Sequence, residues 1–233
     1  MATPRVVSRE EWLQARKDFM AKEKAFTHQR EALARERREL PWVLIDKAYA
    51  FDATEGRVSL ADLFAGKGQL LVYHFMLGPD WKEGCPSCSF WADNYNGVDV
   101  HLAHRDTALV AVSRAPLAGI EAYKKRMGWT FRWVSSLASD FNFDFGVSFD
   151  PSKRVDGALN YNFGTASFSG EEAPGLSAFR RGDDGAVYHT YSTYARGLDM
   201  ANGAYHMLDL TSKGRDEEGL PWPMAWVRRH DSY

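Results

Sequence analysis

Residues 69–93 read QLLVYHFMLGPDWKEGCPSCSFWAD, and the architecture of the chain can be worked out from this segment. Its first part, Gln69 to Met76, is a near-continuous apolar run with glycines nearby on both sides, which is typical of a buried central strand. A loop containing Gly and Pro follows, and then both cysteines of the chain, Cys85 and Cys88, open an amphipathic stretch. The segment therefore predicts a strand, a loop and a helix whose first turn carries two thiols.

Further along the chain, strand and helix patterns alternate. Residues 107–113 (TALVAVS) predict a second buried strand, residues 117–127 a helix, and residues 131–134 a third strand. Two later segments, 176–181 and 186–194, flank Gly-Asp-Asp-Gly and predict a β-hairpin. This order favours an α/β fold, in which a central mixed sheet is flanked by helices.

The N-terminal part of the chain predicts a long solvated helix. Ser8 and Glu11 have the spacing of a capping box, and no Gly or Pro follows until Pro41. Large apolar side chains recur every seventh residue, at Trp12, Phe19, Phe26, Leu33 and Leu40. A single stripe is too thin for a coiled-coil seam. The helix is therefore predicted to pack along its own chain, with a homodimer formed through this arm as the alternative.

Three parts follow from these patterns: a helical arm over residues 1–40, the α/β domain over residues 41–210, and an aromatic tail over residues 211–233 that packs on the domain. Within the domain, the aromatic and Gly-rich residues 139–175 predict a long irregular loop, a kind of segment that often carries function. The tryptophans of the tail are predicted to seal the edge of the core.

Composition and charge exclude several classes of function. The chain of 233 residues has a formal net charge of −2, so it lacks the basic surface expected of a protein that binds nucleic acid or an anionic membrane. Its longest apolar run is too short to span a bilayer, and MATPRVVSREEW lacks the apolar core of a secretory signal. A cytoplasmic location is therefore expected, where a close cysteine pair is catalytic, redox-sensing or metal-binding rather than a permanent disulfide.

The placement of the two cysteines indicates thiol–disulfide exchange. A cysteine at a helix start meets unpaired backbone N–H groups and the positive end of the helix dipole, which stabilise a thiolate. Cys85 is thus the predicted nucleophile, and Cys88, one turn later, is predicted to resolve the mixed disulfide. The substrate would be a disulfide or thiol, carried by a protein or a small molecule. Electrons would come from another dithiol, so no cofactor is predicted.

Other interpretations of the cysteine pair stay open. A metal site would need two more ligands, for which His189 and His206 are candidates, although their separation matches no compact zinc module. Alternatively, both cysteines are inert core residues. The alternative functions are therefore a thiol peroxidase that uses the same two cysteines and a non-catalytic binding or metal-holding module.

A polar segment late in the chain, HTYSTYAR at residues 189–196, is predicted to form a wall facing the dithiol. Strand alternation would put His189, Tyr191 and Thr193 on one face of the sheet. His189 or Arg196 would then tune the thiolate or bind an anionic substrate. An ordinary strand with cross-strand aromatic pairs is the alternative. His74, inside the predicted central strand, is expected to be a hydrogen-bonded core histidine.

Several segments resemble known families. SLADLFAGKGQLLVYHFM, the CPSC helix and LVAVSRA resemble the thioredoxin and peroxiredoxin superfamily, which implies a thioredoxin-like fold. Four further segments are more distinctive: WVLIDKAYAF, GCPSCSFWADNYNG, VYHTYSTYARGLD and GLPWPMAWVRRHDSY. Through them the chain resembles more closely a bacterial family known as domain of unknown function 899, whose members are described as predicted dithiol–disulfide oxidoreductases.

The chain departs from these relatives close to the cysteines. Peroxiredoxins carry Thr three residues and Pro seven residues before the peroxidatic cysteine, where this chain has Lys82 and Gly78, which argues against efficient peroxide reduction. Thioredoxins carry Trp before the first cysteine, where this chain has Gly84. The resemblance also implies a cis-proline opposite the dithiol, for which Pro174 is the candidate; the alternative is a trans proline that starts an edge strand. The complete set of candidate wall residues is Pro174, His189, Tyr191, Arg196, Lys82 and Trp81.

Overall fold

The computed structural model describes residues 4–153 and 159–233 and divides the chain into two compact units, Met1–Pro41 and Trp42–Tyr233. The first unit contains helix α1 (Arg9–Arg38). Ser8 caps its N-terminus and forms the predicted capping box with Glu11, and acidic first-turn and basic last-turn residues complement the helix dipole. No side chain of α1 is buried, so the predicted apolar stripe is exposed.

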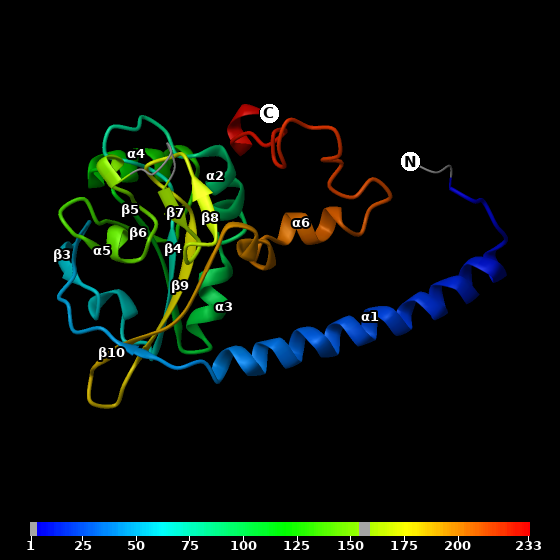
Figure 1. Ribbon diagram of the computed structural model, residues 1–233, viewed down its shortest axis with the longest axis horizontal. Helices are drawn as coiled ribbons and strands as arrows, with labels where there is room; N and C mark the ends of the chain where they lie inside the picture. Colours follow the sequence, from blue (N-terminus) through cyan, green and yellow to red (C-terminus); the bar gives the residue numbers. More distant parts are fainter. Residues whose placement is uncertain (1–3, 154–158) are drawn as a thin grey trace. The chain divides into compact units, whose positions relative to one another are not determined.

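The strands of the second unit, within the described residues, form one large sheet and one small one. They are β1 (Val43–Leu44), β2 (Ala50–Ala53), β3 (Gly56–Ser59), β4 (Gln69–His74), β5 (Thr107–Ser113), β6 (Arg132–Ser135), β7 (Leu159–Tyr161), β8 (Ala166–Phe168), β9 (Gly175–Arg181) and β10 (Val187–Tyr194). Eight of them form a sheet in the order β1-β10-β9-β4-β5-β6-β2-β3, and β7 pairs with β8 (Figure 1).

The helices connect these strands. The α-helices of the second unit are α2 (Pro86–Asp93), α3 (Val98–Ala103), α4 (Leu117–Arg126), α5 (Phe141–Asp144) and α6 (Gly203–Leu208). Short 3-10 helices complete the set of described helices: η1 (Asp62–Phe64), η2 (Pro151–Lys153), η3 (Ala195–Ala201) and η4 (His230–Ser232).

Strand β4 lies at the centre of the sheet and leads into the segment with both cysteines. It pairs in parallel with β5 and antiparallel with β9, and β9 pairs antiparallel with β10. The connection from β4 to β5 contains α2 and α3, as expected for a parallel crossover. Together with helices on both faces of a mixed sheet, this topology is thioredoxin-like, and the predicted fold class is confirmed.

Alternate residues of β4 point into two separate cores. Leu70 and Val72 belong to one core, which η1 and α5 complete, whereas Tyr73 belongs to the other core together with α2 and α4. Because both faces of β4 are buried in these cores, its sequence is a continuous apolar run rather than an alternating one.

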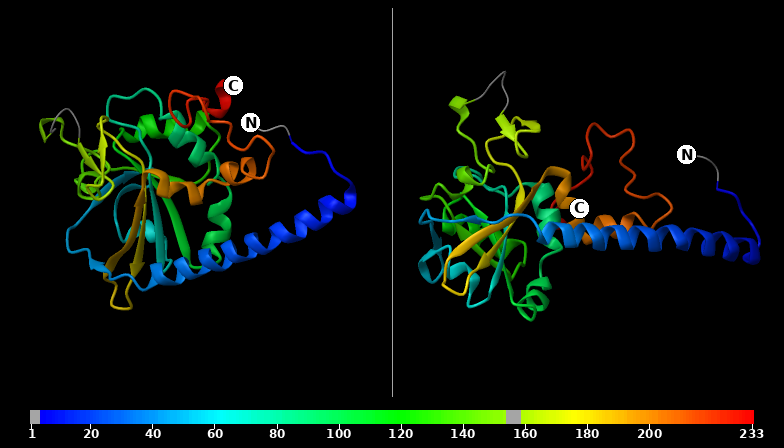
Figure 2. Two further views of the ribbon diagram at one scale, coloured as in Figure 1. Left: turned by 45° about the vertical axis from the view of Figure 1, so that its right-hand side comes forward. Right: turned by 60° about the horizontal axis from the view of Figure 1, so that its bottom comes forward.

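The prediction of an irregular loop over residues 139–175 was wrong in part. Helix α5 and the hairpin β7–β8 lie within this range. The hairpin turns at Asn162, Phe163 and Gly164, which all have left-handed backbones, and Asn and Gly tolerate this conformation best. The hairpin lies at the same end of the sheet as the loop between β4 and α2 (Figure 1, Figure 2).

The C-terminal tail contributes to the core beside α2. Val227 is buried, and the ring of Trp226 packs on Phe90 of α2 at a centroid distance of 5.5 Å. Trp222, by contrast, is 63% exposed, so it does not seal the core as predicted. Within the described residues, no helix has both the length and the apolar character needed to cross a membrane.

Candidate active site

The backbone fixes Cys85 at the start of α2. Cys85 is the N-cap residue, and Pro86 takes the first helical position, where a missing N–H is tolerated. The N–H of Cys85 donates to the carbonyl of Met76 at 3.1 Å, which ties the cysteine back to the end of β4. Its carbonyl accepts from the N–H and the hydroxyl of Ser89, both at 2.9 Å. The loop–helix junction predicted from the sequence is therefore present.

Gly84 permits the chain to pass close to two aromatic rings just before Cys85. A Cβ atom at this position would lie 2.6 Å from ring carbons of both Phe75 and Tyr123. Separations this short are sterically excluded, so a side chain here would force the rings or the loop to move. This contact gives a physical reason for glycine at the position where thioredoxins carry Trp.

The pKa values of the two thiols are shifted in opposite directions. The thiol of Cys88, which donates a hydrogen bond to the sulfur of Cys85, lowers the pKa of Cys85 to about 6 against the opposing effect of burial. The backbone N–H groups of Ser87 and Cys88 and the charge of Arg229 act in the same direction. Burial and the neighbouring Cys85 raise the pKa of Cys88 well above its ordinary value. Both cysteines are free and lie 3.9 Å apart, so Cys85 is the thiolate at neutral pH and Cys88 is its hydrogen-bond donor.

The C-terminal tail holds the loop that precedes Cys85. The guanidinium of Arg229 donates to the carbonyl of Gly84 at 2.8 Å and 3.1 Å and to the hydroxyl of Tyr123 at 3.1 Å. It also forms an ion pair with Glu83 at 3.0 Å, and Arg126 links Glu83 to Asp231 of the tail. Arg229 thus adds positive charge beside the thiolate and fixes the backbone that presents it.

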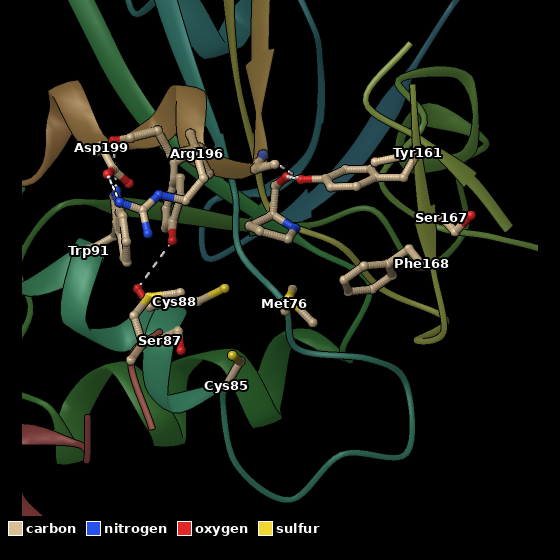
Figure 3. A pocket seen from close by; sticks show the side chains of 16 residues that line it. Met76, Cys85, Ser87, Cys88, Trp91, Tyr161, Ser167, Phe168, Arg196 and Asp199 are labelled. Carbon is tan, nitrogen blue, oxygen red and sulfur yellow. Dashed lines mark hydrogen bonds and ion pairs between the residues drawn. The ribbon is translucent and has the colours of Figure 1, made fainter. Parts of the chain in front are cut away.

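A cavity of about 320 Å³ opens onto both cysteines (Figure 3). Strands β4, β7 and β8, helix α2 and the segments around η3 and the tail supply its lining. The lining residues besides Cys85 and Cys88 are Tyr73, Met76, Ser87, Trp91, Tyr161, Ala166, Ser167, Phe168, Pro174, Ala195, Arg196, Leu198, Asp199 and Met224. Most of them are apolar, and the ion pair between Arg196 and Asp199, at 2.5 Å, is the charged part of the lining.

The structure brings two of the six predicted wall residues to this cavity. Pro174 and Arg196 line it together with both cysteines. His189, Tyr191, Lys82 and Trp81 are not among its lining residues. Trp81 and Lys82 are exposed in the loop before Cys85, and the Trp81 ring packs over Gly78. The prediction that these four side chains face the dithiol is therefore corrected.

A β-bulge explains why His189 points away from the cysteines. The pairing of β10 with β9 shifts between His189 and Tyr191, which breaks the strict alternation assumed from the sequence. His189 consequently lines a second cavity, of about 460 Å³, and packs against Phe145 and Phe179 in the other core.

In that core a chain of hydrogen bonds joins two histidines through two serines. The ring of His189 lies 2.7 Å from the hydroxyl of Ser192, which lies 2.8 Å from the hydroxyl of Ser177, and this hydroxyl lies 2.8 Å from Nε2 of His74. Nδ1 of His74 has no partner among the described residues. Burial lowers the pKa of His74 to about 3, so the ring stays neutral.

Pro174 lines the cavity with a trans peptide bond, since no peptide bond among the described residues is cis. The prediction of a cis-proline was wrong. The segment around Pro174 is held in another way: the N–H of Ala173 donates to Val147, and the carbonyl of Pro174 accepts from the hydroxyl of Tyr161. Trans is the intrinsically preferred state of such a bond, and these contacts are compatible with it.

Sequence reasoning missed several residues of the site. Tyr161 and Phe168 come from the hairpin within the presumed loop, and Met224 and Arg229 come from the tail. The aromatic and Gly-rich composition of residues 159–168 was the available signal for the hairpin. No comparable signal marks Arg229, because only the folded chain brings it to Gly84.

The described residues offer no group of three or more His, Cys, Asp or Glu side chains placed to hold a metal ion. The two histidines considered as partners of the cysteines lie elsewhere. His189 lines the second cavity, and Nε2 of His206 lies 3.3 Å from the carbonyl of Met200.

Comparison with known proteins identifies the family. The model of one family, described as bacterial protein of unknown function (DUF899), matches residues 1–233. The chain belongs to that family. This confirms the resemblance drawn from the sequence. No curated protein sequence matches the chain.

The similar solved structures include thioredoxin-fold peroxiredoxins. Peroxidoxin BcpB from Mycobacterium tuberculosis has 12% sequence identity and a TM-score of 0.47, with 70% of this chain and 93% of that chain covered. A mutant of Xanthomonas campestris peroxiredoxin Q has 14% identity and a TM-score of 0.49, with coverage of 73% and 97%. Reduced 2-Cys peroxiredoxin of Plasmodium vivax has 16% identity and a TM-score of 0.38, with coverage of 72% and 94%. At these identities the likeness concerns the fold alone.

Proposed function

We propose that the protein is a thiol–disulfide oxidoreductase whose redox centre is Cys85 and Cys88. The observation that carries this proposal is the division of labour between the two sulfurs. Cys85 has a pKa lowered to about 6 and lines an open cavity, whereas Cys88 is buried and keeps its proton. A reactive thiolate next to a protonated partner is the state needed to begin exchange.

The exchange would proceed in two steps. The thiolate of Cys85 attacks one sulfur of a substrate disulfide, which forms a mixed disulfide and releases one thiolate. Cys88 then loses its proton to the first departing thiolate, and its sulfur attacks the sulfur of Cys85, which closes the Cys85–Cys88 disulfide and releases the second product as a thiolate that takes a proton from solvent. The N–H groups at the start of α2 and Arg229 would stabilise Cys85 as attacking group and, in the reverse direction, as leaving group. An external dithiol would reduce the pair again.

The reduction potential of the cysteine pair tests this proposal. Known dithiol oxidoreductases span roughly −270 to −120 mV, and a pair with a stabilised thiolate should fall within this range. Equilibration with defined glutathione or dithiothreitol mixtures, read out by alkylation and mass spectrometry, measures it. A pair that never closes into a disulfide would contradict the proposal, and zinc retained in a one-to-one ratio would favour the metal-holding alternative. Rapid direct consumption of hydrogen peroxide would favour the peroxidase alternative.

The proposed reaction also sets expectations for location and partners. A dithiol that cycles between free thiols and a disulfide suits a reducing compartment, so we expect the cytoplasm.

A second copy of the chain is the proposed partner of α1. Phe19, Phe26 and Leu33 of its stripe are more than half exposed, and contact between the stripes of two chains would remove this apolar surface from water.

Light scattering tests the pairing of arms. We expect a dimer that Phe26→Glu dissociates and that Ala21→Glu, on the opposite face of the helix, leaves intact. A wild-type protein that is monomeric at high concentration would contradict this expectation.

A further inference from the structure

We infer that the dithiol cavity selects low-molecular-weight disulfides with short apolar substituents over polar disulfides of the same size. This inference rests on the proposed function and adds the class of substrate. It comes from the route to Cys85, from the hydrogen bonding of the cavity lining and from the volume of the cavity.

The route to Cys85 runs through the cavity. On the side of the tail, Tyr123 and Arg229 close around the backbone of Gly84, the residue before Cys85, through the contacts described above. Cys88 is only 2% exposed, so it offers no entrance of its own. The cavity lining, in contrast, includes both cysteines, and Figure 3 shows Met76 close to Cys85 with Phe168 across from it. A disulfide that reaches the thiolate must therefore fit beside these apolar side chains.

The polar groups of the three large aromatic side chains in the lining that carry one are occupied by the protein itself. The hydroxyl of Tyr73 donates to the carbonyl of Cys88 at 3.2 Å, and the indole N–H of Trp91 donates to the carbonyl of Leu198 at 2.8 Å. The hydroxyl of Tyr161 donates to Pro174 and accepts from the N–H of Ala195 at 2.9 Å. A polar substrate would lose hydrogen bonds to water here and regain few.

The charges of Arg196 and Asp199 in the lining are also compensated by ion pairs within the protein. Oδ2 of Asp199 lies 2.5 Å from Arg196 and 2.8 Å from Arg215 of the tail, and Arg215 pairs in turn with Asp209. The second oxygen of Asp199 has no hydrogen-bond partner among the described residues but is enclosed by the protein, so a ligand cannot reach it. Two arginines and two aspartates cancel, which removes a strong attraction for anionic or cationic substrates.

The volume limits the size of the substrate. About 320 Å³ lies near the lower end of the range for ligand sites, roughly 300–1,000 Å³. The cavity therefore suits a short alkyl chain or one ring on the disulfide rather than an extended polypeptide. With such a disulfide, RSSR, the Cys85 thiolate, the Cys88 thiol and one proton from solvent would give two RSH and the Cys85–Cys88 disulfide, so the two electrons of the pair pass to the substrate.

Two disulfides of equal size test this selectivity. Dipropyl disulfide and bis(2-hydroxyethyl) disulfide differ only in exchanging a terminal methyl for a hydroxyl. For each disulfide, the rate at which it oxidises the reduced protein is divided by the rate at which it oxidises free dithiothreitol. This correction removes the intrinsic difference in reactivity between the two disulfides. We expect the protein to favour the propyl compound by about tenfold after this correction. Trp91 borders the cavity, and its fluorescence can follow the reaction.

The possible outcomes separate this inference from the proposed function. Equal corrected rates, or insulin reduced as fast as the propyl compound, would overturn the inference and leave the exchange activity standing. Failure of both small disulfides to oxidise the pair, while dithiothreitol reacts with them, would overturn the proposed function and the inference with it.

Variants of the lining provide the second test. Met76→Gln keeps the size of the side chain but makes it polar, and Phe168→Ala removes an apolar wall. Each should reduce the corrected preference for the propyl compound over the hydroxyethyl compound several-fold, and closure of the Cys85–Cys88 disulfide by the hydroxyethyl compound reports that the dithiol is intact. Phe163→Ala is the matched control, because Phe163 is exposed and lines the second cavity. An unchanged preference in both Met76→Gln and Phe168→Ala would overturn the inference.

Discussion

The two faces of strand β4 carry opposite kinds of chemistry, although neighbouring residues build both. On one face Tyr73 packs beneath α2, and its hydroxyl holds the carbonyl of Cys88. On the other face His74 stacks on Phe141 and Phe145 and keeps a neutral ring. The pKa of Cys85 is lowered on the first face because the Cys88 thiol, backbone N–H groups and the charge of Arg229 stabilise the thiolate, whereas the second face offers a neutral hydroxyl to the imidazole. The comparison shows that local donors, rather than depth alone, decide which buried group ionises.

The largest expected effect is loss of exchange on the dithiol face. Cys85→Ser should lower turnover of a disulfide at least roughly a thousandfold, because the nucleophile is gone. Cys88→Ser should block turnover as well but still form a mixed disulfide at Cys85, which mass spectrometry detects. Complete turnover by Cys88→Ser would show that Cys88 does not resolve the intermediate.

The close packing around Gly84 should make it intolerant of a side chain. Gly84→Ala should lower the free energy of unfolding by about 1–3 kcal/mol, because its Cβ would overlap the rings of Phe75 and Tyr123. Chemical denaturation measures the change. The matched control is Gly119→Ala in α4, where a Cβ meets open space and a gain of about 0.5–1 kcal/mol is expected. Equal effects of both substitutions would mean that the rings do not confine the loop.

The neutral His74 should make the other face sensitive to acid. The unfolded chain binds a proton at this residue below pH 6.5, whereas the native state does so only near pH 3, so stability falls as the pH drops through this window. The loss should be about 2 kcal/mol between pH 6.5 and pH 5. His74→Asn should remove this part of the pH dependence, measured by denaturation at both pH values, and His101→Asn on exposed α3 should not. An unchanged pH dependence of the free energy of unfolding in His74→Asn would show that another group is responsible.

The smallest effect is expected from the tail. Arg229→Gln removes a positive charge near Cys85 and should raise the pKa of the thiol by less than about one pH unit. The pH profile of thiol alkylation measures this shift, and Arg228→Gln, whose guanidinium donates to the carbonyls of Ala225 and Val227, is the control. A fall in the pKa would contradict the stabilising role assigned to Arg229.

Local patterns were sufficient to predict much of the fold. The apolar run of β4, the cysteine pair at a helix start and the capping box at Ser8 are each specified by residues close together in sequence. The bulge beside His189 was not predictable, because strand alternation assumes unbroken pairing with β9.

The walls of the site depend on contacts between distant parts of the chain. Tyr161 and Phe168 reach the cysteines from β7 and β8, and Arg229 reaches Gly84 across 145 positions. Such contacts follow from the folded topology, and no short pattern in a single sequence encodes them.

The pH dependence of Cys85 alkylation tests the central claim most directly. Iodoacetamide labelling of the reduced protein, resolved by mass spectrometry, should rise with a midpoint near pH 6 at Cys85 and stay far slower at Cys88 at neutral pH. A Cys85 midpoint near the ordinary value of about 8.5, or equal labelling of both cysteines, would contradict the assignment of Cys85 as a stabilised thiolate.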